Sequence, residues 1–350
     1  MPYNTGMPAI TLVLPFALPP SELAPDLIKH LKAPSLAALL SKSSTAAPPP
    51  VQEGLHHLPH EHWLAGAIGQ TDATAWAPRA MRGCGFAPAE GTWFMVHPAH
   101  IEIARSHLLL NDLRQLVLTD AHSRALFGEA LTYVRELGLD LHYADAGTWF
   151  LRADAWAGML TASPDAAAGL DISFFMPSGP GASAFRRLQN ELQMLWHENA
   201  ANSERAGRGQ AAVNAIWTWA GGAAGPAAPG TAGGTGAPLF VADAPAWLQH
   251  IATASGGGIA GAGTLPPHDA IVYADLLSSP AIASDWGRWI GAAEQVERDW
   301  AAPLLAALTA GRIDSVRLVL TGRDRLLDTS TTRLALHKFW RRTSLDKLLT

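Results

Sequence analysis

The densest group of side chains able to bind a small molecule lies between residues 189 and 222. Amides, a histidine and an arginine stand there beside tryptophans, and the candidate ligand-binding residues are Asn190, Glu191, His197, Asn202, Arg205, Asn214 and Trp217. Such polar groups next to indole rings suit a small anionic or hydroxylated ligand. The alternative is that the polar groups tie loops together while the tryptophans fill the core. The stretch suggests no particular catalytic residue.

A second group contains the candidate metal ligands His56, His57, His60, Glu61 and His62. Zinc sites need three or four converging side chains. His60 and His62 are two residues apart, which places them on different faces of a helix, and the HExxH pattern is absent. We therefore favour a solvated loop and a helix start over a metal centre, and we predict neither a metal nor a cofactor.

Two further patterns are weaker. His97 and His100 flank a proline, and they either meet an anion or close a loop by bonding to the backbone. The segment Gly256–Gly261 matches GxGxxG, but a dinucleotide loop must follow a strand and open a helix. Here a predicted helix precedes the glycines and two prolines follow them, so we discard that interpretation. The sequence also contains no P-loop and no GxSxG motif, so no complete catalytic constellation is visible.

Composition narrows the classes of partner and compartment. The 350 residues carry a net charge of −5, and no basic run exceeds the pairs Arg186-Arg187 and Arg341-Arg342, which argues against nucleic acid. The single cysteine, Cys84, excludes an internal disulfide and fits a reducing compartment. The apolar run Ile10–Leu18 has no basic residue before it and is too short to span a bilayer. We expect a cytoplasmic protein that does not contact membranes, and a protein partner remains open.

Three short apolar runs predict the frame that positions these residues. They are Ile10–Leu14, Asp269–Ala274 and Val316–Leu320, and each resembles a strand of a parallel sheet that is buried on both faces. A long helix is predicted between the last two runs, over about 285–310, and Gly311 ends it. Strands that alternate with helices predict a mainly parallel sheet with helices on both faces.

Residues 90–152 have a different pattern, which predicts an inserted α+β subdomain. Two strand-like runs precede a helix capped by Thr119 or Asp120, and a hairpin turning at Asp145-Ala146-Gly147 follows it. Later in the chain we predict a strand at Ile172–Met176, a helix at Ala182–Trp196 and a strand at Val213–Trp219. The predicted domains are 1–88 and 182–350, which form an α/β core, and 89–181, which forms the insertion.

Four segments then carry a resemblance in their order along the chain. They are Ala33–Leu36, Gly83–Pro88, the set His197, Asn202, Arg205 and Asn214, and Val319–Gly322. In this order, spread over about residues 8–342, the chain resembles the archaeal-type cofactor-independent phosphoglycerate mutases of the alkaline phosphatase superfamily. It looks closer still to a bacterial group of RpfE-type regulatory proteins and mutase-like proteins. The resemblance implies an alkaline-phosphatase-like core with an inserted substrate domain.

The chain departs from this family where the family holds its metals. The resemblance implies two divalent metals bound by Asp and His, and a Ser or Thr nucleophile, which has no obvious counterpart before Gly83. The aspartate expected after the first strand is replaced by Pro15-Phe16, and the "DH" expected after Thr321-Gly322 is replaced by Arg323-Asp324. The "DxxGH" pattern survives only as Asp275. A two-metal clamp on the reacting oxygens cannot form from these residues.

We therefore predict a degenerate mutase-like protein that lacks the dinuclear metal site and is a non-catalytic ligand-binding or regulatory protein. One alternative is a phosphoglycerate mutase or phosphohydrolase with a rearranged metal site that uses Asp275 or Asp324. The other is a protein-interaction module whose exposed tryptophans contact a partner.

Overall fold

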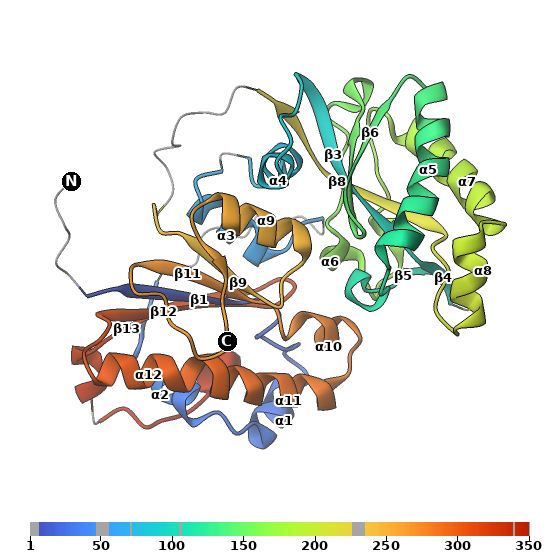
Figure 1. Cartoon of the computed structure of the whole chain (residues 1–350). Coiled ribbons are helices and arrows are strands. Elements are labelled where there is room, and N and C mark those ends of the chain that lie inside the picture. The colour runs from blue at the N-terminus through green and yellow to red at the C-terminus, as the bar shows by residue number, and fades with distance from the viewer. Residues whose placement is uncertain are drawn as a thin grey trace.

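Two β-sheets of different type lie side by side and organise the chain (Figure 1). The computed structural model describes residues 7–46, 56–70, 72–104, 107–225, 235–338 and 340–349. Within these residues the larger sheet has the strand order β10-β9-β11-β1-β12-β13-β2, and the smaller one has the order β6-β7-β3-β8.

The larger sheet is mainly parallel. Its parallel strands are β1 (Ala9–Leu14), β9 (Leu239–Ala242), β10 (Gly258–Ile259), β11 (Ala270–Ala274) and β12 (Ser315–Thr321), while β13 (Leu326–Thr332) runs antiparallel to β12 and pairs with β2 (Ser44–Thr45). Leu12 of β1 is in register with Val272 and Leu318 on its two neighbours. The three strands predicted from apolar runs are confirmed as the centre of this sheet.

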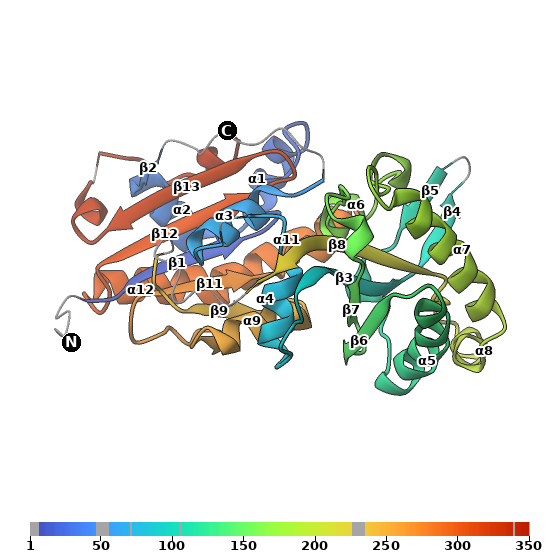
Figure 2. The same ribbon diagram turned by 90° about the horizontal axis from the view of Figure 1, so that it is seen from above.

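Helices cover both faces of the parallel sheet, as Figures 1 and 2 show. One face carries α1 (Ala24–His30), α2 (Pro34–Lys42), α11 (Trp286–Val296) and α12 (Ala302–Thr309), and the other carries α3 (Pro59–Ala67) and α9 (Ala246–Ala254). Helix α4 (Ala77–Gly83) packs against α9 and against the smaller sheet, and the short α10 (Ser278–Ile282) follows β11. The predicted fold class, an α/β protein with a mainly parallel sheet and helices on both faces, is confirmed.

The long helix predicted between the last two parallel strands is also confirmed. It runs through α11, a π-helical turn at Glu297–Ala301 and α12, and Gly311 with a φ of 68° follows its end. Glu297 is buried at the π turn, and its carboxylate accepts the backbone N–H groups of Ser35 and Leu36. This contact caps the start of α2, because the first N–H groups of a helix have no partner inside it.

The smaller sheet is antiparallel and consists of β3 (Gly91–Ala99), β6 (Asp140–Asp145), β7 (Thr148–Arg152) and β8 (Ala215–Ala224). Its outer face is covered by α5 (Asp120–Glu136) and α7 (Ala182–His197), and α8 (Ala200–Gly207) packs against α5. Thr119 caps α5 by accepting the His122 N–H, as the sequence predicts. A separate ribbon of β4 (Ile101–Ala104) and β5 (His107–Leu110) and the short α6 (Pro164–Ala167) complete this half.

Two local predictions need correction. Residues predicted as a strand at 172–176 contain a 3₁₀ helix, Ile172–Phe174, because the Asp171 carboxylate accepts the N–H and hydroxyl groups of Ser173 and turns the chain. The strand predicted at 213–219 begins at Ala215 and continues to Ala224. It starts late because the Asn214 side chain bonds to both backbone groups of Ile101.

The position of β8 also bears on the predicted boundary of the insertion at residues 181 and 182. Because β8 pairs with β3, the antiparallel sheet draws on residues beyond 181. The boundaries 1–88, 89–181 and 182–350 stay predictions, and we propose from this strand pairing that the insertion runs from about 91 to 224.

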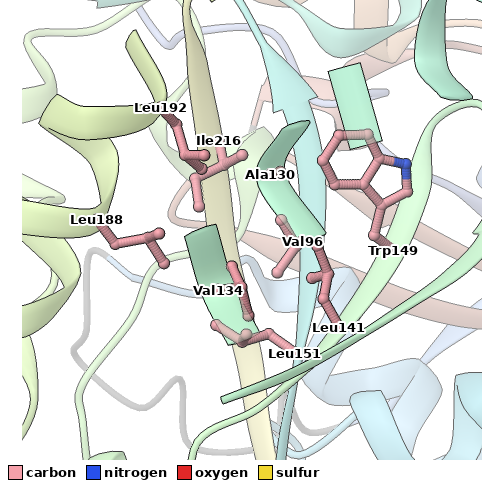
Figure 3. A pocket seen from close by; sticks show the side chains of 9 residues that line it. All are labelled: Val96, Ala130, Val134, Leu141, Trp149, Leu151, Leu188, Leu192 and Ile216. Carbon is pink, nitrogen blue, oxygen red and sulfur yellow. The ribbon is translucent and has the colours of Figure 1, made fainter. Parts of the chain in front are cut away.

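One hydrophobic core joins the two sheets. Residues of the parallel sheet and its helices share a single cluster with Met95, Phe150, Trp217 and Trp219 on the inner face of the antiparallel sheet. A second cluster lies on the outer face, between that sheet and helices α5 and α7. Figure 3 shows a small apolar cavity in this second cluster, lined by Val96, Ala130, Val134, Leu141, Trp149, Leu151, Leu188, Leu192 and Ile216.

The helices of the structure bear on the prediction that the protein does not contact membranes. Across the described ranges, none of the helices combines the length and the apolar character that crossing a bilayer requires.

Candidate functional site

The ends of β1, β11 and β12 meet at one edge of the parallel sheet, next to the antiparallel half of the molecule. In open α/β sheets, ligands bind beyond the carboxyl ends of the strands. At this edge the structure places a group of charged side chains, which we call the arginine cluster: Asp112, Arg114, Asp165, Asp275 and Arg323.

Arg114 is the centre of the arginine cluster. It lies on the 3₁₀ helix Leu113–Gln115, which follows β5. Its Nε and Nη2 donate to Asp275 Oδ2 at 3.0 and 2.8 Å, and Nη1 and Nη2 donate to the two oxygens of Asp165 at 2.8 and 2.6 Å. Nη1 also donates to Asp112 Oδ1 at 3.0 Å. One guanidinium group therefore serves three carboxylates, in the planar forked geometry for which arginine is suited.

Burial decides how these charges behave. The Asp275 side chain is 0% exposed and that of Arg114 is 21% exposed. Burial raises the pKa of Asp275 to about 6, with a further rise from the Asp165 charge, although Arg114 opposes both. Burial also acts to raise the pKa of Asp165, but the charge and hydrogen bonds of Arg114 outweigh it and hold that pKa below its ordinary value. Because carboxylates outnumber guanidinium groups around Arg114, a proton is most easily taken up by Asp275.

Arg323 reaches in the opposite direction. It follows β12, and its guanidinium donates to the backbone carbonyls of Asp165, Ala166 and Ala168 at 3.3, 3.0 and 2.9 Å, at the end of α6. Arg114 therefore extends from the antiparallel half to β11, and Arg323 extends from the parallel sheet to α6. The two arginines cross the junction in both directions and fix Asp165 between them.

The end of β1 holds an aromatic ring. Phe16 has a φ of 54°, in the left-handed region that bulky residues rarely adopt. Its buried ring packs 6.0 Å from the His60 ring and 5.5 Å from the Arg323 guanidinium carbon. Burial lowers the pKa of His60, whose Nδ1 lies 3.3 Å from Thr321 Oγ1, so this imidazole is neutral near pH 7.

These residues do not fit the two divalent metals that the resemblance implies. The end of β1 presents a phenyl ring, and the end of β12 continues into Arg323, whose guanidinium has donors only. Both oxygens of Asp275 already accept from protein donors, Arg114 on one side and Ser278 on the other. In the ranges that the structure covers, no three His, Cys, Asp or Glu side chains are placed to hold a metal ion. We derive no chemical step through a metal.

Three of the seven candidate ligand-binding residues are exposed. Asn190, Glu191 and His197 lie on α7, on the outer side of the antiparallel sheet. Trp217 belongs to the core on the inner side of the same sheet, where its Nε1 donates to the carbonyl of Ala162 at 2.9 Å. The structure therefore does not bring the seven residues around one opening.

The remaining three bond to the backbone. Asn202 donates to the carbonyls of Trp196 and Val213 and accepts the Val213 N–H, each at 2.8 Å. Arg205 is completely buried and donates to three backbone carbonyls, and Asn214 pairs with Ile101. These contacts match the alternative that the polar groups tie loops together. Ligand binding by residues 189–222 stays a prediction.

The histidines make internal contacts as well. Glu61 accepts the Leu58 N–H and so caps the start of α3, which matches the predicted helix start. The predicted solvated setting is wrong, because His60 and Glu61 are buried. His97 Nδ1 lies 2.7 Å from the Gly147 carbonyl and its Nε2 accepts from Trp219, while His100 Nδ1 lies 2.7 Å from the Ala212 carbonyl. The loop-closing interpretation of these two histidines is confirmed.

The glycine-rich segment does not have the setting of a dinucleotide loop. Gly258–Ile259 forms the edge strand β10, and turns follow it rather than a helix.

Comparisons with known proteins bear on the fold. No family model and no curated protein matches the chain. Among solved structures, the PH0037 protein of Pyrococcus horikoshii is similar with 13% identity and a TM-score of 0.51, over 93% of this chain and 88% of that one. A cofactor-independent phosphoglycerate mutase of Thermoplasma acidophilum DSM 1728 aligns at 13% identity and a TM-score of 0.42, over 98% and 94% of the two chains.

The similarity to PH0037 concerns the fold alone, and the alignment with the mutase is too distant to carry an argument. The observed architecture, a mainly parallel sheet with helices on both faces beside an antiparallel sheet, matches the predicted fold class, and its alkaline-phosphatase-like character stays a prediction. The closer relation to RpfE-type proteins stays a prediction.

Proposed function

We propose that this chain is a non-catalytic relative of the phosphoglycerate-mutase-like proteins and acts by binding, as a ligand-binding or regulatory protein. The observation that supports the proposal is the Arg114 guanidinium between Asp275 and Asp165 at the edge of the sheet. A shared fold does not bring a shared reaction, because function depends on the residues at the site.

The geometry around Asp275 argues against metal-assisted phosphoryl transfer. A two-metal site needs carboxylate and imidazole groups with free lone pairs that converge on the ions. Asp275 Oδ2 accepts twice from Arg114, and Oδ1 accepts from Ser278. A cation that binds Asp275 Oδ2 must displace the Arg114 guanidinium from that oxygen, and the mostly buried Arg114 would lose two of its charged hydrogen bonds.

The side chains near the cluster also offer no activated nucleophile within the described residues. Ser278 is completely buried, and its hydroxyl donates a hydrogen bond to Asp275 Oδ1. Thr321 is completely buried as well, at the end of β12. Cys84 lies elsewhere, and burial together with the Asp145 charge raises its pKa to about 12, so it remains a thiol near pH 7.

The proposal is tested by measuring phosphoglycerate turnover with Mn²⁺ or Mg²⁺, together with calorimetric titration of the two ions. We expect no turnover above the protein-free blank and no saturable heat of binding. Metal-dependent turnover that is lost in Asp275→Asn or Asp324→Asn, and kept in the surface variant Asp26→Asn, would instead support the rearranged metal site.

The interaction-module alternative finds support at a different place than predicted. Among the described tryptophans, Trp340 alone is exposed, so a tryptophan surface is not supported. The β4–β5 ribbon instead pairs Ile103, which is 83% exposed, with the exposed Leu108. Sedimentation of the wild type and of Ile103→Lys tests this candidate. If the wild type sediments as an assembly and Ile103→Lys sediments as a monomer, the ribbon is supported as a contact surface. If both proteins are monomers, self-association through the ribbon is excluded.

A further inference from the structure

The chain that follows Arg114 adopts an unfavourable conformation. Val117 has a φ of 38°, which a β-branched residue rarely adopts. The residue is 68% exposed, so packing of its side chain cannot hold it in this conformation. Strain of this kind persists only where surrounding contacts impose it.

Arg205 supplies such contacts. Its Nη2 donates to the carbonyl of Leu116 at 2.6 Å and its Nη1 to that of Val117 at 3.1 Å, while Nε donates to Ala211 at 2.8 Å. The side chain is completely buried, and burial lowers its pKa. Burying a guanidinium is costly unless its donors are hydrogen-bonded, and here backbone carbonyls accept from three of its five N–H groups. Two of those carbonyls belong to the segment that carries Arg114.

Arg205 itself stands on an anchored helix. The Asn199 side chain accepts the Ala201 N–H and caps α8. Asn202, one turn before Arg205, is bonded to the ends of both α7 and the segment that enters β8. Glu204 accepts from His122 on α5 at 3.1 Å. Three neighbouring elements therefore fix the position from which Arg205 reaches the Leu116 and Val117 carbonyls.

We propose that Arg205 is a positioning residue that holds residues 113–117 in the conformation that delivers Arg114 to Asp275 and Asp165. The inference rests on the proposed function, because it names the contact that keeps the arginine cluster formed. The inference also gives a role to Arg205, which the sequence predicts to be part of a ligand site.

The test observes Arg114 directly through its Nε–H resonance in ¹⁵N-edited NMR spectra, assigned by its absence in Arg114→Lys. Arg205→Lys keeps the charge but cannot reach three carbonyls with a planar fork. We expect hydrogen exchange of the Arg114 Nε–H to become about tenfold faster in this variant, because its local protection depends on a fixed segment. The matched internal control is Arg317, which bonds to Asp328 through its own Nε and Nη2.

Two substitutions at the exposed residue Val117 keep the test independent of whether Arg205→Lys folds. Val117→Pro fixes φ near −65° and so excludes the positive φ that Val117 adopts. Exchange of the Arg114 Nε–H should therefore become faster although Arg205 is intact. Val117→Gly adopts positive φ without strain, so it should leave Arg114 protected and should reduce the effect of Arg205→Lys.

The inference is overturned if Arg205→Lys or Val117→Pro leaves Arg114 exchange unchanged, or if Arg114 and Arg317 accelerate equally. Equal acceleration would indicate general destabilisation. These outcomes are distinct from failure of the proposed function, which is decided by metal binding and turnover of the wild type.

Discussion

Both hydrogen bonds from Arg114 to Asp275 end on one carboxylate oxygen, Oδ2, at 3.0 Å from Nε and 2.8 Å from Nη2. The two residues are 161 positions apart, with Arg114 on the 3₁₀ helix that follows β5 and Asp275 directly after β11. Asp275, at the end of β11, is therefore already paired with a positive charge from the chain itself, the Arg114 guanidinium. This relationship leads to the first two predictions.

Replacing Arg114 by methionine should strongly destabilise the protein. The change leaves three neighbouring carboxylates without their shared counter-charge, and breaking a buried ion pair costs roughly 3–5 kcal/mol. Since Arg114 is partly exposed, we expect a loss near the lower limit, about 3 kcal/mol, in the free energy of unfolding measured by urea titration. Asp275→Asn in the same background should recover part of that loss.

The matched control for this substitution is Arg124→Met, which breaks an exposed pair with Asp120 on α5. Exposed ion pairs contribute little because water solvates both partners. If the two arginine variants lost similar stability, the arginine cluster would not be a determinant of stability.

Stability should depend on pH through Asp275. Its pKa in the folded protein is about 6, above the ordinary value of 3.8, so the folded state binds the extra proton. The contribution of Asp275 is complete below 3.8 and is lost as pH rises through 6, so the wild type should gain stability relative to Asp275→Asn as the pH falls from about 7 to about 5. The upper limit is about 3 kcal/mol, since one unit of pKa shift corresponds to about 1.4 kcal/mol.

The control for the pH dependence is Asp275→Asn, which cannot titrate at this position. Histidines such as His60, whose lowered pKa makes acidification destabilising, titrate in both proteins and cancel in the difference between their unfolding free energies. Asp165 does not interfere in this interval, because its pKa is lowered and its contribution is lost only at more acidic pH. Equal slopes in wild type and variant would show that Asp275 is not the titrating group.

Much of the frame could be predicted from the sequence, because apolar runs such as Val316–Leu320 and capping residues such as Thr119 act locally. The arginine cluster could not, because it joins Arg114 to residues 51 and 161 positions away. Nothing in the local pattern distinguishes Arg114 from a surface arginine. The polarity of residues 189–222 suggests a ligand site, but the same polarity is required of side chains that satisfy buried backbone groups.

Asn202→Ala and His197→Ala separate these two uses of polar side chains. Asn202→Ala removes the partner of the Val213 N–H and of the Val213 carbonyl, while the Trp196 carbonyl still accepts from the Asn199 N–H. Each of the two orphaned groups contributes a cost of about 1–3 kcal/mol, so the variant should unfold at lower urea concentration. His197 is exposed on α7, and its replacement should leave the transition unchanged. A small effect of Asn202→Ala would mean that the asparagine is available for a ligand.

Leu192→Ala should test the second hydrophobic core. Leu192 lies at the apolar cavity of Figure 3, and removing its side chain enlarges a space that the protein already fails to fill. The expected cost is about 3–5 kcal/mol, at the upper end for such substitutions, because the surrounding core can collapse only partly. Leu195→Ala on the exposed side of the same helix is the control, and comparable losses at both positions would contradict this description of α7.

The most direct test of the central claim is an anomalous-scattering map from crystals grown with Mn²⁺ and phosphate. The region to inspect lies beyond Leu14, Ala274 and Gly322, where β1, β11 and β12 end. We predict that Arg114 remains bonded to Asp275 and that no anomalous peak lies within coordination distance of that carboxylate. Two peaks bridged by Asp275, with Arg114 displaced from it, would contradict the account.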